Sequence, residues 1–409
     1  SPLPSFFWQG KPCWRVLDTD FSTGRYFFET WRRWHLDAEA PRTLHYVAFC
    51  DSPPSVVQLL NAPAGDPALL ELAQALAAQW TGLTAGFHRL MLAHGQLMLT
   101  LCVGPVPALL RQQQFHADAI LLHSLPPDEL VASGPSWTFK ALGQCCRRGT
   151  TISFMTEIDP ATLAPRLRAS GIQLKPSVPG IDQADAGRLD AVYDPPWELS
   201  RRQTVQNLAA PAQHCTIIGA GLAGASAAAA LARRGWQVTV LDQADAPAQG
   251  ASGLPVGLLV PHVSADDCTL SRLSRAGVRL MLQQARELLV QDQDWSPSGV
   301  FERQIDASPQ LPVGWSAASY DWARPGETVA DPGDGSRHAG ILHHPAGWLK
   351  PAQLVEAWLR HPGITVHTGT RIHALHQHAG LWELRDALGH TVLATPRVIL
   401  ANAGGAKAL

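Results

Sequence analysis

A glycine-rich turn between a strand and a helix constrains the fold of this chain more than any other segment. The sequence CTIIGAGLAGASAAAALARRGWQVTVLD places glycines at Gly219, Gly221 and Gly224. The first allows a tight turn, the second lets a pyrophosphate approach the backbone, and the third lets the helix pack closely against the strand. The helix N-terminus then offers unpaired N–H groups to phosphates. The pattern predicts a βαβ dinucleotide-binding unit, and the weaker alternative is a purely structural turn.

A carboxylate and a second glycine-rich segment follow this turn. Asp242 ends the next predicted strand, where an acid accepts hydrogen bonds from ribose hydroxyls. The stretch from Gln249 to Gly253, which leads into Gly257, resembles the flavin-contacting segment of the D-amino-acid-oxidase-like superfamily. NAD-binding domains do not normally need such a segment, so we expect FAD. The FAD-binding residues expected on this basis are Gly219, Gly221, Gly224, Asp242, Ala251, Ser252, Gly253 and Gly257.

Two later segments match the same superfamily. They are Gly347-Trp348-Leu349-x-Pro351 and the strand Val398–Ala401 with the Asn402-Ala403-Gly404 that follows it. In that superfamily the chain returns towards the cofactor at the second of these segments. The resemblance therefore implies that segments far apart in the sequence meet near one flavin.

The chain length of 409 residues indicates two domains. We expect one domain over residues 1–197, a polar linker over 198–212 and a second domain over 213–409. In the first domain, apolar runs alternate with helical patterns, which predicts a doubly wound parallel α/β sheet. Its predicted strands are Arg15–Asp18, Leu44–Phe49, Leu97–Cys102, Ala119–Leu122 and Thr151–Met155. Its predicted helices are Arg25–Trp34, Ala68–Trp80, Pro105–Gln113, Ser136–Arg147 and Pro160–Ala169.

The second domain is expected to continue the βαβ unit with further strands and helices. The predicted strands His214–Ile218 and Val238–Leu241 enclose the glycine loop and its helix. The other predicted elements are a long helix over Ala276–Val290, a helix over Gln353–Leu359, a strand over Thr365–Thr368, a hairpin of Leu381–Arg385 and Val392–Ala394, and a buried strand over Arg397–Ala401.

Composition excludes several classes of partner and site. The net charge of −2 and the pI of about 6.8 predict no DNA partner, and any RNA contact needs a local patch, for which Arg201-Arg202 is the best candidate. Seven cysteines without a Cys-x-x-Cys pair predict buried free thiols in a reducing cytoplasm. Neither a signal peptide nor a membrane span is expected, and we expect a monomer. The clustered histidines lack an acid or cysteine to complete a site, so no metal is expected.

Taken together, the two halves resemble the bifunctional tRNA 5-methylaminomethyl-2-thiouridine biosynthesis proteins, the MnmC family. The resemblance extends along nearly the whole chain and is most specific over Thr216–Pro261. It implies a Rossmann-like S-adenosylmethionine-dependent methyltransferase domain, followed by an FAD-binding Rossmann domain of the D-amino-acid-oxidase type with part of its substrate domain. The remaining segments that carry it are Val16–Trp31, Leu44–Pro53, 86–90, Leu99–Leu110, Ala117–Pro127, Trp137–Phe154 and Tyr193–Trp197.

The resemblance implies two reactions at the wobble uridine of tRNA. The flavin half oxidises the C–N bond of a carboxymethylaminomethyl group, and hydrolysis of the imine leaves an aminomethyl group. The methyltransferase half then methylates that amine. In the first reaction the flavin N5 takes the hydride, and the protein positions the substrate and excludes water.

The first half departs from the family pattern at three positions. The family's first loop is acid-x-Gly-Phe-Gly-Thr-Gly, whereas residues 18–24 read Asp-Thr-Asp-Phe-Ser-Thr-Gly, so Asp18 and Gly24 are the positions left to contact S-adenosylmethionine. The family's ribose-binding Glu is replaced by Cys50, with Asp51 as a substitute one residue on. His123 stands where the family has a catalytic Asp, and it is either a base or a strand-end histidine. We therefore hypothesise a degenerate methyltransferase domain that folds but binds its cofactor poorly.

The second half is expected to be truncated at its C-terminus. Flavin amine oxidases of this type extend further beyond the first glycine than the 191 residues that follow position 218 here (409 − 218 = 191). Three functions remain open. They are the bifunctional tRNA-modifying enzyme, a stand-alone flavin oxidase for a small amine or amino acid, and a non-catalytic remnant that binds at most a nucleotide.

Overall fold

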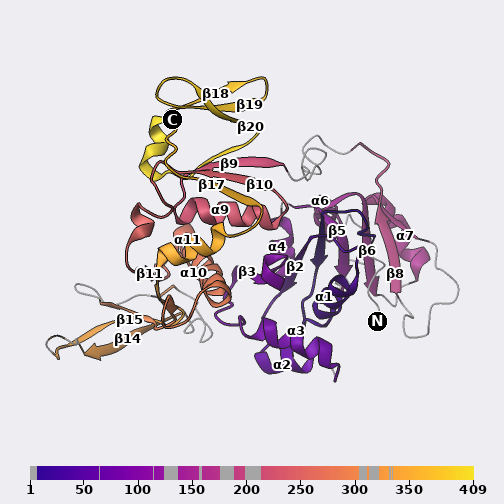
Figure 1. The fold of residues 1–409 in the computed structure, drawn as a ribbon. Helices are drawn as coiled ribbons and strands as arrows, with labels where there is room; N and C mark the ends of the chain where they lie inside the picture. The colour runs from indigo at the N-terminus through magenta and orange to yellow at the C-terminus, as the bar shows by residue number, and fades with distance from the viewer. Residues whose placement is uncertain are drawn as a thin grey trace. The chain divides into compact units, whose positions relative to one another are not determined.

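The computed structural model divides the chain into two compact units, Ser1–Ala209 and Ala210–Leu409 (Figure 1). It describes residues 7–63, 65–113, 115–123, 137–155, 159–175, 188–198, 213–303, 311–312, 322–330, 333 and 335–409. Apart from Glu198, the predicted linker over residues 198–212 lies outside the described residues, and so does the Arg201-Arg202 pair.

Unit 1 is built on an eight-stranded sheet. Its strands lie in the order β3 (Gly86–Leu92), β4 (Leu97–Val103), β2 (Thr43–Cys50), β1 (Cys13–Asp18), β5 (Ala117–Leu122), β6 (Cys146–Met155), β8 (Arg188–Tyr193) and β7 (Ile172–Leu174). Its helices include α1 (Arg25–Leu36), α2 (Val56–Asn61), α3 (Pro67–Ala77), α4 (Val106–Arg111), α6 (Trp137–Gln144) and α7 (Pro160–Ala169).

Both faces of the central strands are buried. Val16 lies in one apolar cluster with Phe27 and Tyr46, and its neighbour Leu17 lies in another with Phe49. Successive side chains of a strand point to opposite faces, so helices must cover both sides of this sheet. The predicted doubly wound α/β fold is confirmed.

The edges of the sheet were not predicted. β3 pairs antiparallel with β4, and β8 pairs antiparallel with both β6 and β7. The helix predicted over Ser136–Arg147 is wrong at its end, because Cys146 pairs with Ala117 and begins β6. Cys146 is fully buried, and an apolar run of this kind does not distinguish a buried strand from a buried helix.

Unit 2 centres on a four-stranded parallel sheet in the order β17 (Ile364–His367), β10 (Gln237–Leu241), β9 (His214–Ile218) and β21 (Val398–Leu400). Its helices include α9 (Leu222–Arg233), α10 (Thr269–Leu288) and α11 (Pro351–Leu359). The buried positions of α10 include Val278, Leu282 and Ala285, whose spacing is that of one helical face. The βαβ prediction is confirmed, although α10 begins before the predicted Ala276.

Three small antiparallel sheets complete unit 2. They contain β11 (Gly257–Leu259), β16 (Gly347–Leu349) and β12 (Trp295–Ser296); β13 (Val300–Arg303), β15 (Arg337–His343) and β14 (Ala323–Ala330); and β18 (Ala374–His378), β19 (Leu381–Arg385) and β20 (Thr391–Thr395). The predicted hairpin corresponds to β19 and β20. The expectation that the strand after Arg397 is buried is wrong at Leu400, whose side chain is 41% exposed.

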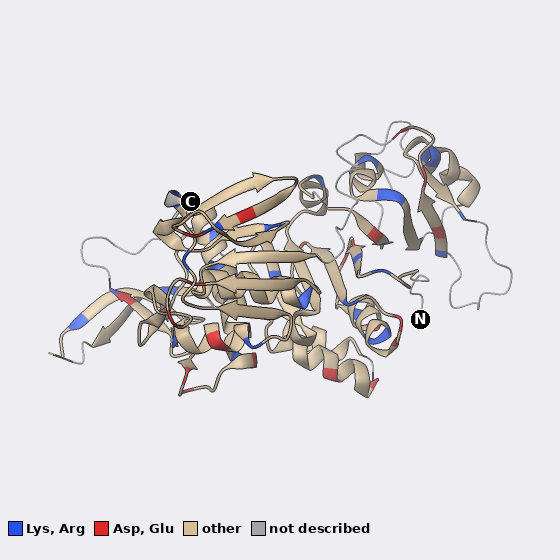
Figure 2. Cartoon of the chain, turned by 45° about the horizontal axis from the view of Figure 1, so that its top comes forward, with Lys and Arg blue, Asp and Glu red and all other residues tan. Residues whose placement is uncertain are grey.

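Charge is spread over the molecule rather than gathered on one element. Figure 2 shows basic and acidic residues interspersed along both units, as a pI near 6.8 implies. Within the described residues, no helix is both long enough and apolar enough to span a bilayer.

Candidate cofactor sites at the two sheet edges

The glycine loop of unit 2 lies between β9 and α9, and two of its glycines are required by packing. Gly219 has a φ of 109°, and a Cβ there would lie 2.6 Å from the carbonyl oxygen of Ala401. A Cβ on Gly224 would lie 1.8 Å from the carbonyl oxygen of Gly219. Gly221 differs, because the nearest neighbour of a Cβ there would be the Ser252 Oγ at 3.0 Å. Only a side chain thus limits the space in front of Gly221.

The N-terminus of α9 has backbone N–H donors that find no acceptor among the described residues. The Leu222 N–H donates to the Ser252 Oγ at 3.0 Å. For the N–H groups of Gly221, Ala223 and Gly224, the described part of the chain supplies no acceptor. Such groups carry the partial positive charge of the helix dipole, so this end of α9 can receive a phosphate.

Asp242 joins the end of β10 to the glycine loop. Its Oδ2 accepts a hydrogen bond from the Ala220 N–H at 2.6 Å, and its Oδ1 accepts one from the Ala244 N–H at 2.9 Å. Each carboxylate oxygen retains a second lone pair that a ribose hydroxyl can use. The contact with Ala220 is a structural role that the sequence did not reveal.

The second glycine-rich segment follows directly and forms one sheet with a distant segment. In β11, Gly257 pairs with Leu349, and Leu258 pairs with Trp348 of β16. The two segments that separately resemble flavin-contacting sequences are therefore neighbours. A Cβ on Gly253 would lie 2.4 Å from the Ala248 carbonyl oxygen, whereas Ala251 is exposed.

These features fit the ADP portion of FAD. The loop presents open N–H groups, and Ser252 lies beside Gly221. The Asn402 Oδ1 is buried with no donor in the described residues, and the Asn402 backbone lies against Gly219. A buried acceptor without a partner is costly, so its position beside the loop points to a ligand.

The corresponding edge of unit 1 is formed where β1 and β5 end. Asp18 is 1% exposed, and both of its oxygens have partners within the protein. The Tyr46 hydroxyl donates to its Oδ2 at 2.6 Å, and the Asp20 N–H donates to its Oδ1 at 3.0 Å. The His123 Nε2 lies 3.0 Å from the same Oδ1 as an ion pair. Asp18 is thus part of an internal network, and its near-complete burial and the His123 contact distinguish it from the half-buried Asp242.

His123 is held from several sides. The centroid of its ring lies 4.4 Å from that of Tyr26, and the His123 backbone N–H donates to the Thr19 Oγ1 at 3.1 Å. Burial alone would lower the pKa of His123, but the Asp18 carboxylate and then Asp20 outweigh it, and the pKa is raised. The raised pKa makes the imidazole more basic, and its Nε2 faces Asp18, so the role of His123 as a base stays a prediction.

The loop between Asp18 and α1 is closed by an aromatic side chain. Gly24 has a φ of 86° and precedes α1, and a Cβ there would lie 2.8 Å from Phe21 Cζ. Phe21 is 2% exposed and stacks on Trp80 at 5.4 Å. The space beside the glycine predicted to face S-adenosylmethionine is therefore filled by protein.

The ribose position at the end of β2 carries no charge. Burial, with smaller contributions from Asp20 and Asp51, raises the pKa of Cys50 to about 12, so its thiol is neutral. Asp51 is exposed just beyond β2, and its carboxylate remains accessible. Asp18 has partners within the protein, Phe21 fills the Cβ side of Gly24, and Cys50 is neutral, while Asp51 is the accessible acid of the predicted set. Their contact with S-adenosylmethionine stays a prediction.

A reactive cysteine in unit 2 was not predicted from the sequence. Cys268 precedes α10 and is half-buried, as is Cys13, so the expectation of burial is wrong for these two thiols. The Ser264 hydroxyl donates to the Cys268 Sγ at 3.4 Å, and the Ser271 Oγ lies 3.5 Å from it. The hydrogen bond from Ser264, and next that from Ser271, lower the pKa of Cys268 to about 7. The signal in the sequence was a cysteine directly before a long helix.

Metal binding has no support within the described residues. They contain no group of three or more His, Cys, Asp or Glu side chains arranged to hold an ion.

Comparison with known proteins identifies relatives for the whole chain. The family model described as DAO, FAD dependent oxidoreductase, matches residues 214–409. A protein of Albidiferax ferrireducens named tRNA 5-methylaminomethyl-2-thiouridine biosynthesis bifunctional protein MnmC is 47% identical over 413 residues, which cover 98% of this chain and 63% of the relative. The protein of the same name from Verminephrobacter eiseniae is 43% identical over 425 residues, with 98% and 67% coverage.

Among solved structures, glycine oxidase from Geobacillus kaustophilus is 16% identical, with a TM-score of 0.37 over 48% of this chain and 56% of that chain. The chain spans 63% and 64% of the length of the Albidiferax relative and of a second one, from Polaromonas naphthalenivorans.

Proposed function

The chain belongs to the MnmC family of tRNA 5-methylaminomethyl-2-thiouridine biosynthesis bifunctional proteins, and on that premise we propose that unit 2 performs the FAD-dependent oxidation of a tRNA wobble uridine. The substrate is the 5-carboxymethylaminomethyl-2-thiouridine side chain, whose carboxymethyl group is removed from nitrogen. The observation that carries the proposal is the open N-terminus of α9 behind Gly219–Gly224, within a segment that matches an FAD-dependent oxidoreductase family.

Different residues of unit 2 bind different parts of FAD. The N–H groups of Gly221, Ala223 and Gly224 receive the pyrophosphate, and Asp242 receives a ribose hydroxyl while it holds the Ala220 N–H. Ala251, Ser252, Gly253 and Gly257 line the path from the loop to β11. When bound, FAD supplies the acceptor for the hydride that leaves the carbon next to nitrogen. Water then cleaves the resulting imine, which releases the two carboxymethyl carbons as glyoxylate and leaves the aminomethyl group on the uridine.

Unit 1 is proposed to keep the methyltransferase fold while binding S-adenosylmethionine poorly. This follows from the internal partners of Asp18, the aromatic closure at Gly24 and the neutral Cys50. Methylation of the aminomethyl group by unit 1 is then weak or absent. Isothermal titration of the chain with S-adenosylmethionine tests this, and saturable binding in the micromolar range contradicts it.

The partner that follows from the proposal is tRNA, without a DNA or membrane partner. The chain is further proposed to act as a monomer in the cytoplasm, where its substrate and its reduced cysteines are found together. Gel filtration with light scattering tests the monomer, and a dimer under dilute conditions contradicts it.

Two measurements test the oxidative function. The purified chain should show flavin absorption after incubation with FAD. Nucleoside mass spectrometry of tRNA from a deletion strain should show loss of carboxymethylaminomethyl uridine when the chain is supplied. Unchanged modification in a strain that contains flavin-loaded protein contradicts the proposal. Oxidation of sarcosine or glycine without tRNA would support a stand-alone amine oxidase instead.

A further inference from the structure

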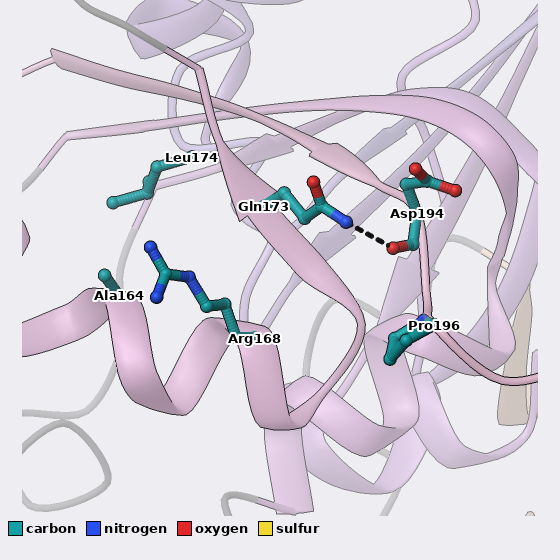
Figure 3. Close-up of a pocket in the computed structure, with 6 residues that line it drawn as sticks. All are labelled: Ala164, Arg168, Gln173, Leu174, Asp194 and Pro196. Carbon is teal, nitrogen blue, oxygen red and sulfur yellow. Dashed lines mark hydrogen bonds between the residues drawn. The ribbon is translucent and has the colours of Figure 1, made fainter.

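A pocket of unit 1 lies away from the cofactor edge, between α7, β7 and the turn after β8 (Figure 3). Its volume is about 360 Å³, and ligand pockets span roughly 300–1,000 Å³. It is lined by Ala164, Arg168, Gln173, Leu174, Asp194 and Pro196. None of these residues belongs to the Asp18 network.

The wall of this pocket beyond β8 is held in place by several contacts. The Asp194 N–H donates to the Gly171 carbonyl at 2.8 Å, and the Gln173 Nε2 donates to the Asp194 carbonyl at 2.7 Å. Arg148 pairs with the Asp194 carboxylate and donates to the Pro195 carbonyl at 2.9 Å. The wall is thus formed before any ligand binds, which lowers the entropic cost of binding.

The opposite wall presents a cation, Arg168, for which the described residues supply no counter-charge. Arg168 lies one helical turn after Ala164 on α7, and its side chain is exposed. No carboxylate or other acceptor for its guanidinium is found in the described ranges. The nearby acid, Asp194, is already paired with Arg148. An anionic ligand in this pocket therefore meets an unpaired guanidinium.

The remaining lining suits a planar, partly polar group. The Gln173 Nε2 is engaged, so its Oε1 is left as an acceptor without a donor in the described chain. Leu174 and Pro196 supply apolar contacts, and Figure 3 shows them on opposite sides of the pocket. Trp197, the next residue, is 44% exposed. A nucleotide offers a phosphate for the guanidinium, a base edge with N–H donors for the amide oxygen and a planar face for the exposed ring.

We propose that this pocket binds one nucleotide of a single-stranded RNA segment. The phosphate binds the Arg168 guanidinium, which presents a fork of donors, and the base lies against Pro196 and Trp197 with a polar edge at the Gln173 Oε1. Unpaired RNA bases are recognised in this way, through stacking and edge contacts. The inference rests on the proposed function, which makes tRNA the substrate.

Fluorescence anisotropy with the full chain and a labelled tRNA anticodon stem-loop tests the pocket. Arg168→Ala should weaken binding about tenfold and reduce the slope of log affinity against log salt by about 0.7, the share of one phosphate contact. Arg168→Lys should retain the salt slope and lose part of the affinity, because Lys lacks the fork. The matched control is Arg166→Ala, which removes the same charge from α7 at a position that does not line the pocket. It should change affinity by less than about twofold.

The possible results distinguish failure of the pocket from failure of RNA binding. Equal loss in Arg168→Ala and Arg166→Ala, or no loss in Arg168→Ala, overturns the pocket while RNA binding itself stands. AMP that competes with the stem-loop at equal affinity overturns an RNA strand in favour of a free nucleotide. A wild-type chain that binds no tRNA overturns the pocket together with the tRNA part of the proposed function. The flavin spectrum of that chain then shows separately whether the oxidative half remains.

Discussion

The two sheet edges of this chain resemble each other in topology and differ in how their polar groups are used. In unit 1, Asp18 at the end of β1 is surrounded by Tyr46, Asp20 and His123. In unit 2, the turn after β9 has backbone N–H groups without an acceptor in the described residues, and Asp242 accepts a hydrogen bond from the Ala220 N–H of the loop. A parallel sheet creates a crevice at its carboxyl end, but a ligand binds there only where donors and acceptors remain unpaired. Unit 1 fills that crevice with its own side chains.

Reactivity of the cysteines should show the largest difference between the two units. At about pH 7, roughly half of Cys268 is thiolate, whereas Cys50, whose pKa is raised to about 12, is almost entirely thiol. Iodoacetamide should therefore label Cys268 at least about a thousandfold faster than Cys50, as measured by peptide mass spectrometry. Ser264→Ala should raise the pKa of Cys268, because its hydroxyl is the main stabilising donor. Equal labelling rates contradict the assignment.

Closing the glycine loop should remove flavin binding from unit 2. In Gly224→Val, the added side chain meets the Gly219 carbonyl, which displaces α9 from β9. FAD affinity, followed by quenching of flavin fluorescence, should fall about a hundredfold or more. The matched control is Gly277→Ala in α10, where a Cβ has no neighbour within 4 Å. Unchanged FAD affinity in Gly224→Val would rule out this loop as the phosphate site.

Removing the central carboxylate should destabilise unit 1 rather than open a site. Asp18→Ala leaves the Tyr46 hydroxyl and His123 without their partner, which costs about 3 kcal/mol when a buried ion pair is broken. Hydrogen exchange of peptides from β1, β2 and β5 measures this loss. Asp51→Ala, at an exposed carboxylate, should change the stability by less than about 0.5 kcal/mol. If both variants exchange alike, the Asp18 network does not stabilise the edge.

The pH dependence of unit 1 should give the smallest effect. The pKa of His123 is raised in the folded state from its ordinary 6.5, so the stabilisation it provides is complete below that value and is lost as pH rises through the folded pKa. Amide hydrogen exchange in β1 and β5 should therefore accelerate with rising pH by more than the intrinsic exchange rate of an unstructured chain does. His123→Asn should remove this excess while it keeps a polar side chain at the position. If the additional acceleration of exchange persists in His123→Asn, another group is responsible for the pH dependence.

Local patterns predicted the βαβ unit of the second half closely. The predicted strand His214–Ile218 coincides with β9, and Val238–Leu241 differs from β10 by one residue. Apolar strands, glycine turns and an alanine-rich helix act over short ranges, so their sequence signals are strong. The outer strands β3 and β7 and the strand β8 next to β7 were missed, because their sequences are short or mixed and their pairing depends on strands distant in the chain.

Sequence alone determined which residues stand at the two edges. It placed Gly219, Gly221, Gly224 and Asp242 around one turn, and it showed that the loop after Asp18 and the position of His123 depart from the family pattern. Residue types and short spacings suffice for that, because backbone conformation at a turn is a local property.

Only the tertiary structure decided whether the polar groups of those residues already have partners within the protein. Tyr46 and His123 reach Asp18 from other strands, and Phe21 turns back to fill the space beside Gly24. The same holds for the pocket between α7 and β7, where Arg148 neutralises Asp194 and Arg168 has no counter-charge among the described residues. Hydrogen bonds and ion pairs between residues far apart in the chain form only when the sheet brings them together, so no local pattern records which partner each group takes.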